Sequence, residues 1–296
     1  MASFFESKDS EYGAAKGSQS FTCRIDNVRD ITDVLMCLSL NTKKDLLCLF
    51  EATPESLMFV VTGRSKNTQA RLSLPADLFD DYMCSTTNAV QLSLNLCTLL
   101  DCMQLFGASD TAAATLTYSS EDATFRLSLE DSGILTACEL SGMYHEEEDE
   151  ALQGGLFAAF RDSPEESAVV LRSEALREHV QELCDVSGAA SVKVRLDSMA
   201  MWMATSGADE STCELNIPCG ADIFVSYNVA EQTGTWTYPL SSLQLATKAL
   251  GVAKETFMRI NSDGLMCMQH QVEGKSGREV FVDFLLVPME SGLEAW

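Results

Sequence analysis

Basic residues are scarce in this chain of 296 residues. It has 20 Lys plus Arg against 44 Asp plus Glu, which gives a formal net charge of −24. The average field of such a chain repels phosphate, so it excludes a protein that holds nucleic acid by overall attraction. Contact with nucleic acid would need a local basic patch or a particular geometry. The common alternative interpretation is that the acidity only keeps the surface solvated.

Histidine and the usual catalytic motifs are also lacking. The three histidines, His145, His179 and His270, have no second His or Cys at metal-ligand spacing. The sequence contains no G-x-S-x-G, no Gly-rich phosphate loop that ends in Lys-Ser or Lys-Thr, and no G-x-G-x-x-G. The acidic pair Asp30 and Asp33 fits capping or surface positions. We therefore expect no catalytic residues, no metal and no cofactor.

Paired cysteine motifs and long apolar runs are missing as well. None of the 11 cysteines forms a C-x-x-C pair, and most lie in apolar segments, as Cys37 does between Met36 and Leu38. This is typical of reduced, buried thiols inside a cell. No run approaches the roughly 18 apolar residues of a membrane span. The first residues lack the apolar core of a signal peptide, so we expect a soluble intracellular protein.

The first half predicts a mixed α and β domain. With 46% hydrophobic and 22% charged residues, the composition is globular, and the length suggests two domains. Val28, Ile31 and Leu35 predict a helix after Asp26, and helical spacing recurs over Asn95–Phe106. Strand patterns occur in Leu46–Ala52, Ser56–Thr62, Thr68–Leu74, Ala89–Leu94, Ala114–Tyr118, Ala123–Leu129 and Ile134–Leu140.

The second half repeats the same order of elements. Helices are predicted over Ser173–Cys184 and Pro239–Leu250, whereas Pro218–Gln232 shows no clear pattern. The last strand has the composition of a strand buried on both faces. The predicted strands are Ala168–Leu171, Ser191–Leu196, Met199–Ala204, Thr212–Ile217, Glu255–Ile260, Leu265–Val272 and Glu279–Val287.

This repetition predicts an internal duplication. Arg24 and Arg29 flank the start of the first helix. Arg172 and Arg177 flank the start of the third helix, in each case 148 positions later. Between the halves, a connector holds the acidic run His145–Glu150 and two phenylalanines that could dock on a neighbouring surface. The predicted parts are a flexible tail (1–20), an N-terminal domain (21–141), the acidic connector (142–166), a C-terminal domain (167–290) and a short tail (291–296).

Four segments carry a resemblance to a known family. Leu94–Gly107, which reads LNLCTLLDCMQLFG, resembles the second-helix motif of the Rad-one subunit family of the nine-one-one DNA-damage checkpoint clamp. Leu171–Glu178, Ser242–Leu250 and Val280–Pro288 resemble the same family. The wider pattern is shared with the replicative sliding clamp PCNA. The resemblance implies an α+β sliding-clamp fold of two similar domains, each with two helices on a curved antiparallel sheet.

The resemblance also implies a function. Such a chain would be a non-catalytic nuclear subunit of a heterotrimeric ring that encircles double-stranded DNA. Its partners would be two non-identical clamp subunits, a clamp loader, and checkpoint and repair client proteins, with no membrane. Because encirclement retains the DNA, a few inward cations would suffice. The candidates are Arg29, Arg177, Lys248 and Lys254. The alternative interpretation is that these are ordinary solvated charges.

Two further sets of site residues follow from the resemblance. Subunits would join through edge strands; the candidates are Ile134, Thr136, Cys138, Cys213, Leu215 and Ile217. The alternative is that loops cap these edges. Client peptides would bind a groove beside the connector; the candidates are Leu40, Met143, Tyr144, Leu152, Leu156 and Pro288.

Two other functions stay open at this point. The first is a homotrimeric processivity clamp of the PCNA type, which the mass of the assembled ring would reveal. The second, remote alternative is a 3′–5′ exonuclease, since that activity has been attributed to parts of the family. No carboxylate cluster in the sequence supports it.

Overall fold

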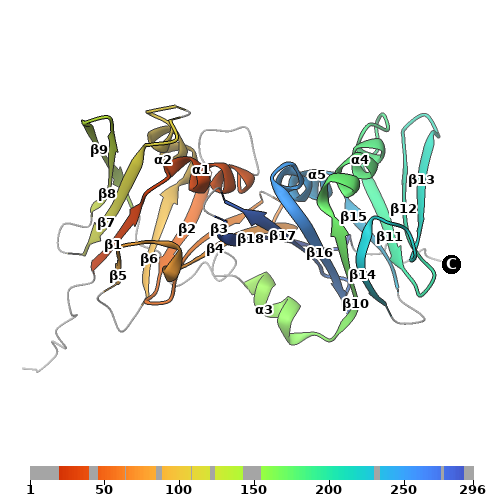
Figure 1. The fold of residues 1–296 in the computed structure, drawn as a ribbon. Coiled ribbons are helices and arrows are strands. Elements are labelled where there is room, and N and C mark those ends of the chain that lie inside the picture. The colour runs from red at the N-terminus through yellow and green to blue at the C-terminus, as the bar shows by residue number, and fades with distance from the viewer. Residues whose placement is uncertain are drawn as a thin grey trace, which may run out of the picture.

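The two halves of the chain repeat one order of elements: strand, helix, five strands, helix and three strands (Figure 1). This confirms the predicted duplication. The computed structural model describes residues 20–39, 46–63, 65–84, 89–107, 109–120, 124–142, 155–229, 234–274 and 277–289. Structural statements below concern these residues.

The first half contains two α-helices and nine strands among its described residues. Its elements are β1 (Ser20–Ile25), α1 (Val28–Cys37), β2 (Leu47–Ala52), β3 (Ser56–Thr62), β4 (Thr68–Pro75), the 3₁₀ turn η1 (Ala76–Leu78), β5 (Tyr82–Cys84), β6 (Val90–Asn95), α2 (Leu96–Met103), β7 (Ala113–Ser119), β8 (Thr124–Asp131) and β9 (Ile134–Ser141).

The helix α3 (Gly155–Asp162) precedes the second half, which repeats the first. Its elements are β10 (Glu165–Arg172), α4 (Ser173–Cys184), β11 (Ser191–Leu196), β12 (Ala200–Ser206), β13 (Thr212–Pro218), β14 (Phe224–Val229), β15 (Thr235–Pro239), α5 (Leu240–Ala246), the 3₁₀ turn η2 (Thr247–Gly251), β16 (Ala253–Asn261), β17 (Met266–Glu273) and β18 (Glu279–Leu286).

The strands form three antiparallel sheets. One has the order β5-β1-β7-β8-β9 and another β13-β12-β11-β15. The third is continuous through both halves, in the order β14-β10-β16-β17-β18-β4-β3-β2-β6, because β18 pairs with β4. The burial of β18 on both faces is confirmed, since Val282, Phe284 and Leu285 are all fully buried. This pairing, called the internal joint below, fixes the two halves relative to each other.

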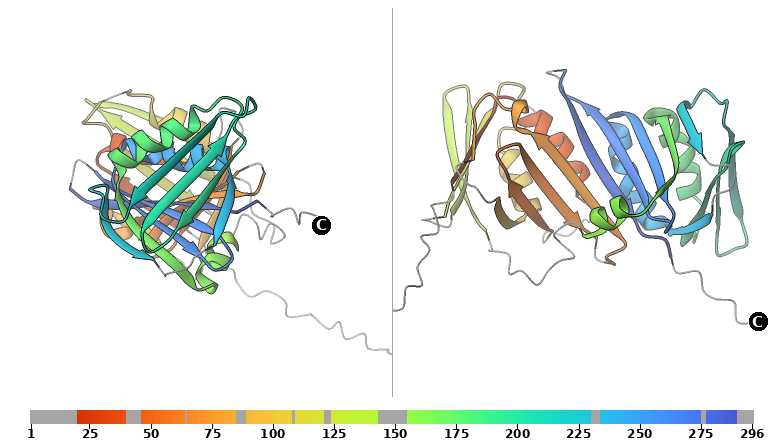
Figure 2. Two further views of the ribbon diagram at one scale, coloured as in Figure 1. Left: turned by 90° about the vertical axis from the view of Figure 1, so that its right-hand side faces the viewer. Right: turned by 90° about the horizontal axis from the view of Figure 1, so that it is seen from below.

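The two helices of each half lie along one side of the sheets, in the order α2, α1, α5 and α4 (Figure 1). Strands cover the other side (Figure 2, right). Helix α1 begins where Asn27 caps it by accepting a hydrogen bond from the backbone N–H of Arg29 (3.1 Å). Asn95 caps α2 in the same way through Thr98. The apolar faces of these helices pack on the sheets, as helical spacing predicted.

Three elements differ from the sequence expectation. Strand β14 lies in the stretch 218–232, where no element was predicted, and its exposed positions explain the weak pattern. Helix α3 lies in the predicted connector, where Phe157 does dock on the sheet, packing against Cys267 and Leu285. Helix α5 ends at Ala246 and continues as the 3₁₀ turn η2.

All 11 cysteines lie within the described residues and are free thiols. Burial raises the pKa of the Cys37 thiol to about 11 and that of the Cys267 thiol to about 12. These thiols therefore stay protonated at neutral pH. No helix in the described part of the chain is long and apolar enough to cross a membrane.

Candidate functional site

Two matched turns align the halves residue by residue. The Tyr82 hydroxyl donates to the backbone carbonyl of Thr53 (2.5 Å), and the Tyr227 hydroxyl donates to that of Asp197 (2.7 Å). Thr53 and Asp197 each close a tight turn by accepting hydrogen bonds from the N–H groups two and three residues further on. The backbone hydrogen bonds from Met199 and Ala200 stabilise the charged form of the Asp197 carboxyl, which lowers its pKa.

The matched tyrosines show that the predicted correspondence of the arginines, 148 positions apart, is wrong. Tyr82 lies opposite Cys23 and Tyr227 opposite Val169, so Cys23 and Val169 are equivalent. Arg24 is therefore equivalent to Val170 and not to Arg172, and the matching arginine spacing is a coincidence. Exposed charges are free to change, whereas the two turns are held in the same geometry by matching hydrogen bonds.

The internal joint has an apolar face toward the helices and a charged outer face. On the apolar face, Val282 lies opposite Leu72 and Phe284 opposite Ala70, and all four side chains are fully buried. On the outer face, Asp283 lies opposite Arg71.

The outer face of the joint carries an ion pair that was not predicted from the sequence. Nη2 of Arg71 lies 2.6 Å from Oδ2 of Asp283, and Gln269 donates to the other carboxylate oxygen (2.8 Å). The signal was present in the sequence. Asp283 is the one acid inside the apolar run Val280–Leu286, and an acid in such a position implies a buried partner.

Strands β9 and β13 are free edges within the described residues, and each is the counterpart of one strand of the joint. Starting from the match of Cys23 with Val169, the strand registers match Leu116 with Met258 and then Leu127 with Met268. Continuing to the next strand makes β9 equivalent to β18. Likewise, β13 is equivalent to β4. Strands β4 and β13 both end in a proline, and each proline lies opposite the last residue of a matched turn. Pro75 lies opposite Ser56, and Pro218 lies opposite Ala200.

All six residues predicted at the subunit interface lie on these two free edges. Ile134, Thr136 and Cys138 take the places of Val280, Val282 and Phe284. Cys213, Leu215 and Ile217 take the places of Ala70, Leu72 and Leu74. The joint residues are buried, whereas Ile134 is 59% exposed. The free edges therefore present the two halves of a second joint, for which the described residues supply no partner strand.

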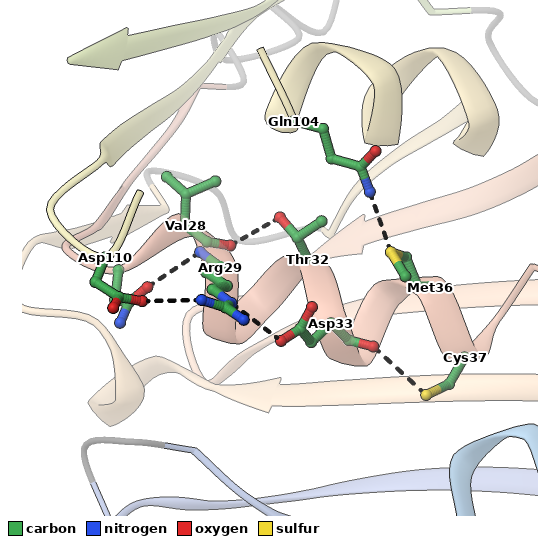
Figure 3. Close-up of polar contacts among 9 residues, drawn as sticks. Val28, Arg29, Thr32, Asp33, Met36, Cys37, Gln104 and Asp110 are labelled. Carbon is green, nitrogen blue, oxygen red and sulfur yellow. Dashed lines mark hydrogen bonds and ion pairs between the residues drawn. The ribbon is translucent and has the colours of Figure 1, made fainter. Parts of the chain in front are cut away.

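The first predicted DNA-facing residue, Arg29, is already engaged by carboxylates. It lies on α1, and its guanidinium is 3.2 Å from Asp110 and 3.8 Å from Asp33 (Figure 3). Gln104, the C-cap residue of α2, donates to the sulfur of Met36 on α1, which joins the two helices (Figure 3). Arg29 thus offers less free positive charge than its sequence position suggested.

The other three cations differ in setting. Arg177 is exposed on α4, with its guanidinium beside Gly251. Lys248 on η2 donates to the carbonyl of Ser39 (2.5 Å) across the two halves, and burial lowers its pKa. Lys254 is exposed and lies on β16, not on a helix.

Acidic side chains outnumber basic ones on the exposed helix surfaces. No basic residue occurs on α2. The acidic residues on α1, α2 and α4 are Asp30, Asp33, Asp101, Glu174, Glu178 and Glu182. These helix surfaces therefore offer few cations to a phosphate group. In the described ranges, no group of three or more His, Cys, Asp or Glu side chains could hold a metal ion.

The predicted client groove is only partly visible. Leu40, Met143, Tyr144 and Leu152 lie outside the described residues. Leu156 packs beside Phe157 on the outer face of the nine-stranded sheet, and Pro288 follows the end of β18. The rings of Phe157 and Phe160 face the guanidinium groups of Arg71 (4.0 Å) and Arg259 (5.5 Å). Helix α3 thus covers the joint on the side away from the other helices (Figure 1).

The sequence matches a family model over residues 20–272, described as Repair protein Rad1/Rec1/Rad17. The chain belongs to this Rad1 family. The mouse Cell cycle checkpoint protein RAD1 is 26% identical, over 90% of this chain and 91% of its own length. The fission yeast (Schizosaccharomyces pombe) DNA damage checkpoint control protein rad1 is 24% identical, over 89% of this chain and 84% of its own.

The fold of this Rad1-family chain is that of a sliding clamp. A solved PCNA2–PCNA3 complex from Sulfolobus tokodaii aligns with a TM-score of 0.70, over 90% of this chain and 98% of that one, at 10% identity. The predicted α+β fold of two similar domains, each with two helices, is confirmed. The likeness spans both halves, so it includes the internal joint.

Proposed function

We propose that this chain is a non-catalytic subunit of a heterotrimeric checkpoint clamp that encircles DNA. It is loaded at damaged DNA in the nucleus, and it recruits checkpoint signalling and repair proteins. Membership of the Rad1 family and the sliding-clamp fold support this function. In this function, any reaction on the DNA is catalysed by the recruited proteins and not by this chain.

The internal joint is the observation that carries the proposal. It joins a β18-type strand to a β4-type strand, and the free edges β9 and β13 are one strand of each type. A contact between unlike edges is heterologous, and such contacts form a closed ring when the rotation between subunits permits. Repeating the joint between three two-domain chains gives a ring of six similar units.

In this ring the four helices line the hole, as the row in Figure 1 suggests. Retention is then topological, which fits a net charge of −24 and an acidic helix surface. Arg177 and Lys254 are the exposed cations available for loose phosphate contacts. Arg29 and Lys248 contribute less because both are already paired.

Native mass measurement tests the assembly. The chain is mixed with the two other candidate clamp subunits, and the expected species is a 1:1:1 complex. A stable homotrimer of this chain alone would favour the PCNA-type alternative. A chain that stays monomeric in every mixture would refute the proposal.

The retention of the loaded ring on circular DNA tests whether these cations face the hole of the proposed ring. The double change Arg177→Glu and Lys254→Glu should shorten the residence of the loaded ring, and more steeply as salt rises. The matched control is Lys193→Glu with Arg195→Glu, which makes the same charge change on β11, at positions that alternate with the core residues Val192 and Val194. Equal residence for both double variants would contradict a hole lined by helices.

A further inference from the structure

The charge and the side-chain volumes of the internal joint are not reproduced at the free edges of the same chain. We infer that the strand that pairs with β13 belongs to a different protein, which carries a basic residue opposite Glu214 and a large apolar residue opposite Cys213. This inference rests on the proposed ring function. It adds the chemistry by which the ring selects one partner and rejects a second copy of this chain.

Glu214 sets the charge on the outer face of the β13 edge. It occupies the β13 position that Arg71 occupies on β4. In the internal joint, Arg71 lies opposite an acid, Asp283. Glu214 has the opposite sign, and its carboxylate accepts a hydrogen bond from the indole N–H of Trp202 (2.5 Å), which holds it on the outer face. A complementary strand must therefore present a cation where β18 presents Asp283.

The β9 edge of this chain cannot supply that cation. The counterpart of Asp283 on β9 is Ala137. The only charged residue on β9 is Glu139, which is already paired with Arg126 of β8 (2.9 Å). In a joint between two copies, Glu139 would lie diagonally across from Glu214, and like charges at such cross-strand positions destabilise pairing.

Side-chain volume also disfavours pairing between two copies, independently of charge. In the internal joint, the large Phe284 lies opposite the small Ala70. The corresponding residues of the free edges are Cys138 and Cys213, so two copies would bring two small side chains together. The missing ring volume would leave a cavity, which costs stability in a packed interface. A partner with a bulky residue opposite Cys213 fills this space.

A gain-of-function variant tests both arguments in this chain alone. The wild type should sediment as a monomer. The double variant Ala137→Arg with Cys138→Phe gives β9 the missing charge and volume, so it should self-associate in a concentration-dependent way. Adding Glu214→Arg places two cations opposite each other and should weaken that association by at least about tenfold.

The register of the new contact is checked by cross-linking. By the alignment above, Thr136 of one copy lies opposite Leu215 of the next, as Val282 lies opposite Leu72. The double variant with Thr136→Cys and Leu215→Cys added should form a disulfide between these positions, identified by mass spectrometry. A double variant that stays monomeric, or associates without this disulfide, overturns the inference.

The inference and the proposed function can fail separately. Wild-type chain that self-associates through the same Thr136–Leu215 contact overturns the selection argument but leaves a ring intact. The same holds if Glu214→Arg enters the three-protein ring as strongly as wild type. Failure of the wild type to join any candidate clamp subunit refutes the ring itself.

Discussion

Arg71 and Asp283 are 212 positions apart in the sequence, yet they form an ion pair with a shortest N–O distance of 2.6 Å across the internal joint. The Asp283 side chain is only 6% exposed, and its two carboxylate oxygens accept hydrogen bonds from Arg71 and from the amide of Gln269. The ring of Phe157 on α3 covers the Arg71 guanidinium. The two halves are thus connected by a shielded ion pair as well as by backbone pairing.

Removing Arg71 should therefore be costly. Arg71→Met leaves Asp283 as a buried charge without its cation, and we expect the free energy of unfolding to fall by roughly 3 kcal/mol in urea denaturation. The double change Arg71→Met with Asp283→Leu should recover most of the loss. The exposed pair of Arg126 and Glu139 provides the control, because Arg126→Met should cost about 1 kcal/mol or less. Equal costs at both sites would contradict a shielded pair.

His270 should make stability depend on pH. It is fully buried, its Nδ1 lies 2.9 Å from the Thr256 hydroxyl, and burial lowers its pKa to about 4 from 6.5. The unfolded state therefore binds the proton first as pH falls. Stability should be unaffected above about pH 7 and should decrease between about pH 6.5 and 4, by about 1.4 kcal/mol per pH unit.

Denaturation at a series of pH values checks this. His270→Leu should flatten the slope between pH 6.5 and 5, whatever it does to absolute stability. His179→Gln, a change at a partly exposed helix position, should keep the wild-type slope. An unchanged slope in His270→Leu would assign the pH dependence to other groups.

Gly264 should tolerate no side chain. Its φ is +76°, and an added Cβ would lie 2.3 Å from the Trp236 ring. Gly277 has a similar φ of +73° but open space around it. In thermal or chemical denaturation, Gly277→Ala should cost about 1 kcal/mol from backbone strain alone. Gly264→Ala should cost about 3 kcal/mol because overpacking adds to the strain. Similar losses for both would rule out the contact with Trp236 as the cause.

Helix α3 should detach without unfolding the domains. Its anchor Phe157 belongs to a small cluster with Cys267 and Leu285, separate from the main core. Phe157→Ala should speed amide hydrogen exchange in α3, while protection in β17 and β18 stays close to that of the wild type. Ala159→Gly, at an exposed α3 position, controls for the loss of helix propensity. Loss of protection throughout the sheet would mean that α3 is part of the core.

Much of the fold could be predicted because period-2 and period-3.6 patterns report burial directly. Val192, Val194 and Leu196 alternate on β11 as the pattern predicted, and all three are buried. Strand β14 was not predictable in this way, since Phe224–Val229 lies at a sheet edge with few buried positions. Its place is set by pairing with β10, not by its own pattern.

The candidate site was less accessible to sequence reasoning than the fold. Cys138 and Cys213 could be placed on edge strands from the family resemblance, but their mismatch with Phe284 and Ala70 required the register of the joint. For Arg29, the sequence could not reveal the ion-pair partner. Its position suggested a free cation, and only tertiary structure brought Asp110, 81 positions away, to its side chain.

The unbroken nine-stranded sheet has a mechanical consequence. Flexing the chain at its middle would shear the backbone hydrogen bonds between β18 and β4 and separate Arg71 from Asp283. The chain therefore behaves as a stiff arc with no hinge at the joint between β18 and β4. In the proposed ring, a gap that admits a DNA duplex would have to form at an end of the arc, where β9 or β13 releases its neighbour.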